Sequence, residues 1–85
     1  MNENDQLMAE IREANLAYLM LAQHMIRRDR AQALFRLGLT EEVATVVDGL
    51  SPQQIVRIAS NPMLLCRFRF DDETVWGLVA NHGKQ

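Results

Sequence analysis

The side chains in this sequence that could carry out covalent chemistry are few and scattered. His24 lies in an apolar stretch, His82 lies near the C-terminal end, and Cys66 is the one cysteine among the 85 residues. A catalytic nucleophile needs a base within reach and a third group that orients the base, and no such set is grouped here. One cysteine cannot supply a four-ligand zinc site, and there is no glycine-rich phosphate loop. We expect no enzyme activity and no cofactor.

The arginines are better suited to binding than to catalysis. Residues 27–38 and residues 51–70 each carry a net charge of +3, whereas the whole chain carries −2. A negative total charge is not typical of a general nucleic-acid binder. The arginines are therefore either solvated surface with exposed ion pairs, or a patch for phosphates or an acidic partner. Those assigned to partner or phosphate contact are Arg27, Arg28, Arg30 and Arg36.

The apolar spacing of the N-terminal third predicts a helix with two adjacent apolar stripes. One stripe comprises Leu7, Ile11, Ala14, Tyr18, Leu21 and Met25, and the other comprises Met8, Leu19, Ala22 and Ile26. Two stripes favour a helix that packs against its own domain and also against a second copy. The alternative is a central core helix that the other helices cover. The predicted dimer interface consists of Leu7, Ile11, Tyr18, Leu19, Ala22 and Met25.

Capping signals divide the rest of the chain into further helices. The expected N-cap residues are Asp29, Thr40, Ser51 and either Asp71 or Asp72. Gly38 suits the left-handed residue that ends the second helix. Residues 30–49 thus have the order of a DNA-binding helix-turn-helix. Its second helix, however, carries carboxylates and none of the side chains that read base edges, so we expect this pair to be structural.

Residues 64–70 alternate apolar and polar side chains, as a strand does. A single strand leaves unpaired backbone groups at both edges. The segment is therefore short and solvated, bent into a loop, or paired across a subunit boundary. Together these elements predict an all-α fold, a small bundle of about five short helices with one short extended segment at about 64–70, assembled as an intertwined homodimer.

The N-terminal residues lack the basic region of a signal peptide. The longest uninterrupted apolar run, residues 16–22, is too short to cross a bilayer. We therefore expect a cytoplasmic protein without a membrane partner.

Five segments, taken in order, resemble the bacterial flagellar transcriptional regulator FlhD family. They are NLAYLMLAQ (15–23), DRAQALFRLG (29–38), EEVAT (41–45), LSPQQIVRIA (50–59) and CRFRFD (66–71). The resemblance implies a subunit of a transcriptional activator, a homodimer that assembles with FlhC to bind promoter DNA and switch on flagellar operons. The chain would contribute mainly assembly and specificity. The alternative is a protein–protein adaptor or antagonist with no DNA binding of its own.

The resemblance also implies how the chain is divided and cross-linked. Residues 1–82 would form the FlhD-like dimerisation domain and residues 83–85 a disordered tail. A further C-terminal arm is expected in family members, which makes direct DNA contact by these 85 residues less expected. Near the axis of a two-fold dimer a residue meets its own copy, so one cysteine per chain is enough for a bridge. The family resemblance favours Cys66 as the site of an interchain disulfide.

Overall fold

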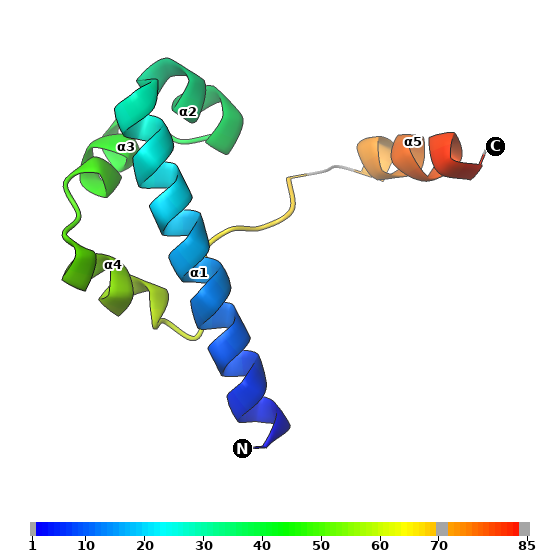
Figure 1. Cartoon of the computed structure of the whole chain (residues 1–85). Helices are drawn as coiled ribbons and strands as arrows, with labels where there is room; N and C mark the ends of the chain where they lie inside the picture. Colours follow the sequence, from blue (N-terminus) through cyan, green and yellow to red (C-terminus); the bar gives the residue numbers. More distant parts are fainter. Residues whose placement is uncertain (1, 70–71, 84–85) are drawn as a thin grey trace.

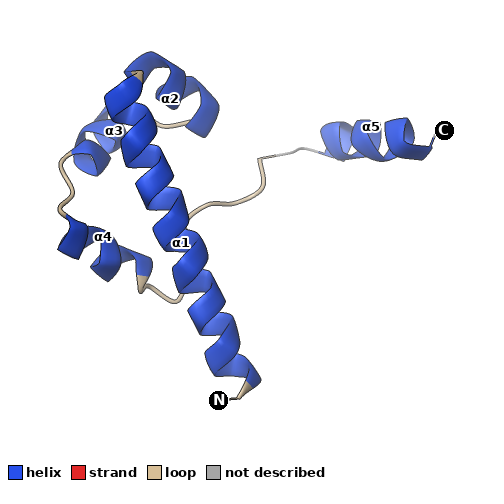
Figure 2. Ribbon diagram, in the orientation of Figure 1, coloured by secondary structure: helices blue, strands red, loops and turns tan. Residues whose placement is uncertain are grey.

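A computed structural model describes residues 2–69 and 72–83 of the chain and shows five α-helices and no strand among them (Figures 1 and 2). The helices are α1 (Glu3–Arg28), α2 (Arg30–Leu37), α3 (Glu41–Asp48), α4 (Pro52–Ala59) and α5 (Asp72–Gly83). The all-α prediction is confirmed. One element is not short: α1 has 26 residues and runs along most of the body of the molecule.

The predicted caps explain where the short helices begin. The Asp29 side chain accepts a hydrogen bond from the Gln32 backbone N–H at 3.2 Å. Asp29 also closes α1, because its own N–H donates to the Met25 carbonyl at 2.8 Å. Asp29 therefore ends α1 and begins α2. At the other end of α2, Gly38 has a φ of 68°, the left-handed conformation that favours glycine.

The start of α4 is a complete capping box. The Ser51 hydroxyl accepts from the Gln54 N–H at 3.2 Å, and the Gln54 side chain accepts from the Ser51 N–H at 2.8 Å. Pro52 occupies the first helical turn, where its missing N–H does no harm. Thr40 caps α3 in the simpler way, accepting from the Val43 N–H at 3.2 Å. These predicted starts are confirmed.

The core lies between α1 and the three short helices that follow it (Figure 1). Near the C-terminal end of α1, its residues pack with α2 and α3 in a cluster formed by Ala22, Ile26, Ala33, Ala44 and Val47. Nearer the middle, a second cluster joins α1 to α4 and consists of Leu19, Ile55 and Ala59. Alanines at the contact points let the helix backbones approach closely. The predicted helix pair α2–α3 thus contributes its apolar face to the core.

Residues 60–69, here called the arm, first pass along α1 and then project from helices α1–α4, here called the body, toward α5 (Figure 1). Within the described residues α5 makes no contact with α1–α4. The radius of gyration is 16.0 Å, whereas a compact chain of this length has about 12 Å. Of the alternatives for the extended segment, residues 64–69 form a loop within the chain and no ladder with another described segment, and pairing across a subunit boundary stays a prediction. Phe70 and Asp71 lie outside the described residues.

Candidate assembly surface

One face of α1 is already covered by the chain itself. Leu19 and Ala22, two of the residues predicted for the dimer interface, are only 6% and 2% exposed. They lie on the stripe that packs against α2, α3 and α4. In this arrangement they support the core and present little surface to a second subunit.

The other residues predicted for the dimer interface follow a separate stripe on α1. Leu7 is 51% exposed, and Ile11, Tyr18 and Met25 are half-buried. Their spacing of four and seven residues places them within a narrow sector of a helix that turns about 100° per residue. Leu21 lies beside this stripe and is 52% exposed. Met25 also packs against the core cluster of its own chain, so the part of the stripe that is most open to a second copy is its N-terminal end at Leu7.

The arm and α2 form a hollow of about 330 Å³ next to the same stripe. It is lined by Tyr18, Leu37, Gly38, Leu39, Leu65, Cys66, Arg36, Arg67 and Arg69. The Cys66 thiol is free and half-buried. Arg69 anchors this part of the arm, because its guanidinium donates to the Arg36 carbonyl at 2.5 Å. An arginine at that place also complements the C-terminal end of the α2 dipole.

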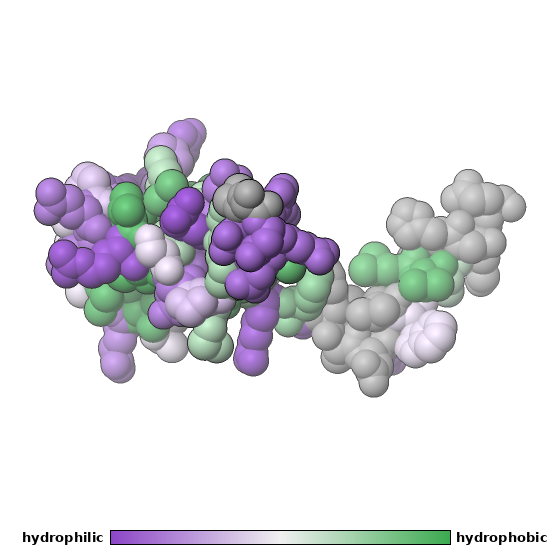
Figure 3. All heavy atoms as spheres, turned by 90° about the horizontal axis from the view of Figure 1, so that it is seen from below, coloured by the Kyte–Doolittle hydropathy of each residue, from purple (hydrophilic) through white to green (hydrophobic). Residues whose placement is uncertain are grey.

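The arm and α5 carry large apolar side chains in contact with water. Phe68 is 91% exposed and Trp76 is 69% exposed. Leu78 and Val79 on α5 are exposed as well, and apolar side chains are visible among the atoms that Figure 3 colours on the projecting part. Exposed apolar residues grouped on one segment mark an interaction surface.

Two of the four predicted contact arginines form ion pairs within the chain. The Arg27 Nε donates to Asp48 Oδ1 at 2.9 Å, and both side chains are largely exposed, at 57% and 44%. The Arg30 Nε donates to Glu41 Oε2 at 2.9 Å. The first pair connects α1 to α3 and the second connects α2 to α3. Exposed pairs of this kind contribute little to stability.

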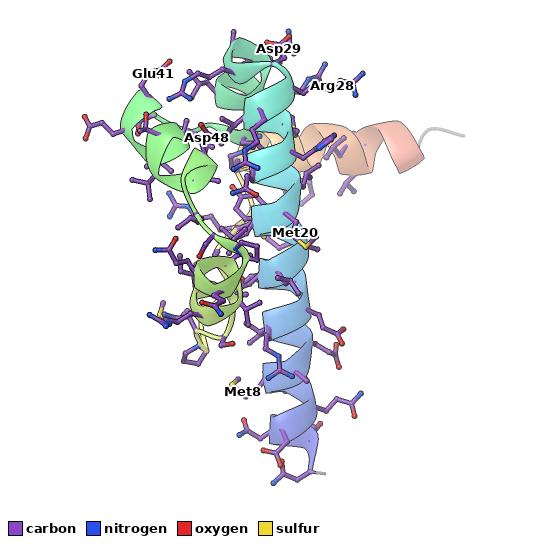
Figure 4. All side chains as sticks on the ribbon, turned by 60° about the vertical axis from the view of Figure 1, so that its left-hand side comes forward. Met8, Met20, Arg28, Asp29, Glu41 and Asp48 are labelled. Atoms are coloured by element: carbon purple, nitrogen blue, oxygen red, sulfur yellow. The ribbon has the colours of Figure 1, made fainter. Side chains whose placement is uncertain are left out.

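The other two arginines are more open to a partner. Arg28 is exposed and extends from the C-terminal end of α1, away from Glu41 and Asp48 (Figure 4). Arg36 is also exposed, and its Nε donates to the neutral Gln32 side chain at 3.0 Å. Within the described residues the structure does not join the four arginines into one site.

Two amide side chains that the sequence analysis did not single out organise the connections between helices. Asn15 Nδ2 donates to the carbonyls of Ala59 and Met63 at 3.2 and 2.9 Å. Gln23 Nε2 donates to the carbonyls of Val47 and Leu50 at 3.1 and 2.9 Å. The available signal was an uncharged polar residue in an apolar helix, at a position in line with core residues.

A groove of about 510 Å³ lies between α1 and α4, on the side of the core away from Tyr18. Its apolar lining comes mainly from Leu16, Met20, Ile55 and Val56. The described residues contain no group of three or more metal-ligating side chains. In the same part of the chain, no helix is long and apolar enough to cross a bilayer. The exposed features thus point to contacts with macromolecules.

Comparison with known proteins supports a function in contacts with macromolecules. A model of the family "Flagellar transcriptional activator (FlhD)" matches residues 1–85. The chain is 58% identical to the flagellar transcriptional regulator FlhD of Acidovorax sp. (strain JS42) over 79 residues, which cover 93% of this chain and 72% of the relative. It is 56% identical to that of Ralstonia nicotianae over 78 residues, covering 92% and 74%. With Burkholderia pseudomallei FlhD it shares 43% identity over 84 residues, covering 99% and 79%.

These matches confirm the predicted family and its role in transcription regulation rather than catalysis. They extend across the helices of the body, the arm and α5. The chain belongs to the flagellar transcriptional activator (FlhD) family.

Proposed function

We propose that this chain is the homodimerising subunit of a flagellar transcriptional activator, and that it joins FlhC in the cytoplasm to form the complex that binds promoter DNA. Its own contribution is assembly and specificity. Residues 1–82 act as the dimerisation domain. The observation that carries the proposal is the exposure of Phe68 in the arm and of Trp76, Leu78 and Val79 on α5, which makes no contact with α1–α4 within the described residues.

The exposed apolar surface supports dimerisation through two regions of the chain. The first is the α1 stripe, in which Leu7 is exposed and Ile11, Tyr18 and Met25 are half-buried. The second is the projecting segment with Phe68 and Trp76. An isolated helix of 12 residues such as α5 is marginal in water unless an apolar face is packed. A second copy whose body receives the arm supplies that packing, which is what an intertwined homodimer means.

The arginines support contact with an acidic partner or with phosphates. Arg28 and Arg36 are exposed and form no ion pair with a described carboxylate. Arg27 and Arg30 already have carboxylate neighbours at the surface, so a partner would have to compete for them or bind beside them. We assign Arg28 and Arg36 the larger part in assembly.

An alternative function is that of a protein–protein adaptor without DNA binding of its own. One observation favours it: the outward side of α3 presents the exposed carboxylates Glu41 and Glu42, which repel phosphates. The helix pair α2–α3 is therefore poorly suited to enter a DNA groove by itself.

A gel-shift experiment separates the two functions. Flagellar promoter DNA is incubated with this chain alone, with FlhC alone, and with both, at a stated salt concentration. An activator subunit gives a shift with both proteins that is stronger than with FlhC alone. An adaptor or antagonist leaves the FlhC shift unchanged or weakens it. Sedimentation of the chain alone at micromolar concentration tests the homodimer separately.

A further inference from the structure

We propose that Asn15 is the positioning residue of the arm: its side-chain amide determines where the arm leaves α1 and so brings Cys66 and α5 to a second copy of this chain. This inference rests on the proposed homodimer and assigns a role within it to one buried side chain.

Asn15 is a buried polar residue whose amide nitrogen and amide oxygen both have hydrogen-bond partners. Its exposed fraction is 0%, although it lies in the middle of an apolar helix. Besides Ala59 and Met63, Nδ2 points to the Asn61 carbonyl at 3.5 Å. The Oδ1 atom accepts from the Leu65 backbone N–H at 2.7 Å. With two amide hydrogens and one accepting oxygen, this side chain holds three points along the chain, at Ala59, Met63 and Leu65, from the end of α4 to the middle of the arm.

Other polar anchors of the arm are few. In the described part of the chain, Met63 N–H donates to the side chain of Asn61, which lies within the arm itself. The Arg69 guanidinium reaches the Arg36 carbonyl, near the far end of the arm. Asn15 is therefore the contact that joins the first half of the arm to α1. Because buried backbone groups need partners, losing this amide removes the side-chain partner of the carbonyl of Ala59, a residue that is only 1% exposed.

The position of Asn15 on α1 determines which part of the arm lies next to Tyr18 and the rest of the predicted dimer interface. Asn15 precedes Tyr18 by three residues, close to one helical turn. Leu65, which bonds to Asn15, and Cys66, which follows it, line the same hollow as Tyr18. The amide thus places the thiol beside the stripe through which we expect the second copy to pack.

The anchor also limits how far α5 can travel. From Leu65 to the start of α5 at Asp72 is seven residues, which span at most about 25 Å when extended. Whenever the single Arg69 contact opens, a chain without the Asn15 anchor has a free segment that begins near Ser60 and spans about 40 Å. A shorter tether confines α5 and raises its effective concentration at one docking place. Releasing it permits many more positions, including contacts with its own body.

Gln23 provides a matched control. It lies on the same helix, its amide also donates to backbone carbonyls, and those carbonyls belong to the link between α3 and α4. Replacing Asn15 or Gln23 by alanine removes the same kind of interaction from the body. Of the two variants, only Asn15→Ala frees the first half of the arm from α1, and the Arg69 contact with the end of α2 is unchanged in both.

The test compares wild type, Asn15→Ala and Gln23→Ala by thermal unfolding, by sedimentation equilibrium, and by the rate of Cys66–Cys66 cross-linking with a bismaleimide. We expect both variants to lower the melting temperature. Asn15→Ala should weaken the dimer at least tenfold and slow cross-linking by a similar factor. Gln23→Ala should change either quantity less than twofold. Equal effects of the two variants on dimerisation, or an undisturbed Asn15→Ala dimer, would overturn the inference.

A second measurement needs no variant and therefore does not depend on Asn15→Ala being folded. Hydrogen exchange in the wild type should show a protected Leu65 amide between neighbours that exchange quickly. Exchange of Leu65 as fast as that of Arg67 and Phe68 would contradict the anchor. A monomeric wild type overturns the homodimer and this inference with it, whereas a dimeric wild type with an unaffected Asn15→Ala dimer overturns the inference alone.

Discussion

The body, helices α1–α4, and the projecting segment of arm and α5 differ in where their apolar side chains are covered. All eight buried apolar residues in the described part of the chain belong to the body. The arm and α5 carry Phe68 at 91% exposure and Trp76 at 69%. The body therefore has an apolar core of its own, although residues such as Phe35 remain exposed on it, whereas the described residues of the projecting segment include no buried apolar side chain. Substitutions in the two regions should have different effects, one on folding and the other on assembly.

The largest effect is expected from a change in the body core. Leu19→Ala removes a side chain that packs between α1 and α4 and should lower the free energy of unfolding by about 2–5 kcal/mol, the usual range for such cavities. That is a large part of the stability of a domain this small. Leu19→Glu, which buries a charge, should prevent folding. Urea unfolding followed by circular dichroism measures both.

Phe35→Ala is the control for this prediction. Phe35 lies on α2 and is 82% exposed, so its removal should change the free energy of unfolding by less than about 0.5 kcal/mol. Equal destabilisation by Leu19→Ala and Phe35→Ala would show that the assignment of the core is wrong.

A change in α5 should act on assembly instead. Trp76→Asp and Leu78→Asp place charges on the exposed apolar side chains of α5, which has no contact with its own body. We expect the dimer to weaken by at least tenfold, because an unpaired charge would have to be buried on docking. Sedimentation at a series of concentrations measures this, and circular dichroism should show that the helices of the body remain. A dimer of unchanged affinity would remove α5 from the interface.

The starts of α2, α3 and α4 and the end of α2 could be predicted from the sequence, because each depends on residues only a few positions apart. Asp29, Thr40 and Ser51 cap the helices as predicted, and Gly38 ends α2 as predicted. The course of the arm was not readable, because it depends on bonds such as that between Asn15 and Leu65, 50 residues apart. The alternating pattern of the arm suggested a strand, yet the described chain offers no second strand to complete a ladder.

The candidate interface was predictable only in part for a related reason. Apolar spacing identifies the stripes of α1 but does not say which stripe the other helices will cover. Leu19 and Ala22 were assigned to the dimer interface from spacing, and the structure places both in the core of their own chain. Similarly, the sequence does not show that Arg27 has an ion-pair partner, because that partner, Asp48, lies 21 residues further along the chain on α3.

Cys66 offers a smaller, chemical test of the idea that the projecting segment, unlike the body, acts in assembly. If the arms of two copies meet near a two-fold axis, the free and half-buried thiol of each lies close to its mate, with α-carbons within about 7 Å. Oxidised protein should then show a covalent dimer on a non-reducing gel, and Cys66→Ser should abolish it. The noncovalent dimer should persist in sedimentation, because the bond follows assembly and does not drive it. Failure to cross-link under mild oxidation would place the thiols apart.

The smallest effect on folding is expected from Arg27→Ala together with Arg28→Ala. The Arg27–Asp48 pair is exposed and such pairs contribute about 0.2–1 kcal/mol, so the melting temperature should move by only a few degrees. Assembly with FlhC, measured by co-purification or by gel shift, should weaken if these arginines meet an acidic partner or phosphates. Asp48→Ala is the control, because it breaks the same ion pair and leaves both guanidinium groups in place. Weaker assembly in the arginine variant but not in Asp48→Ala assigns the arginines to the partner; equal weakening in both would assign the effect to the ion pair between α1 and α3.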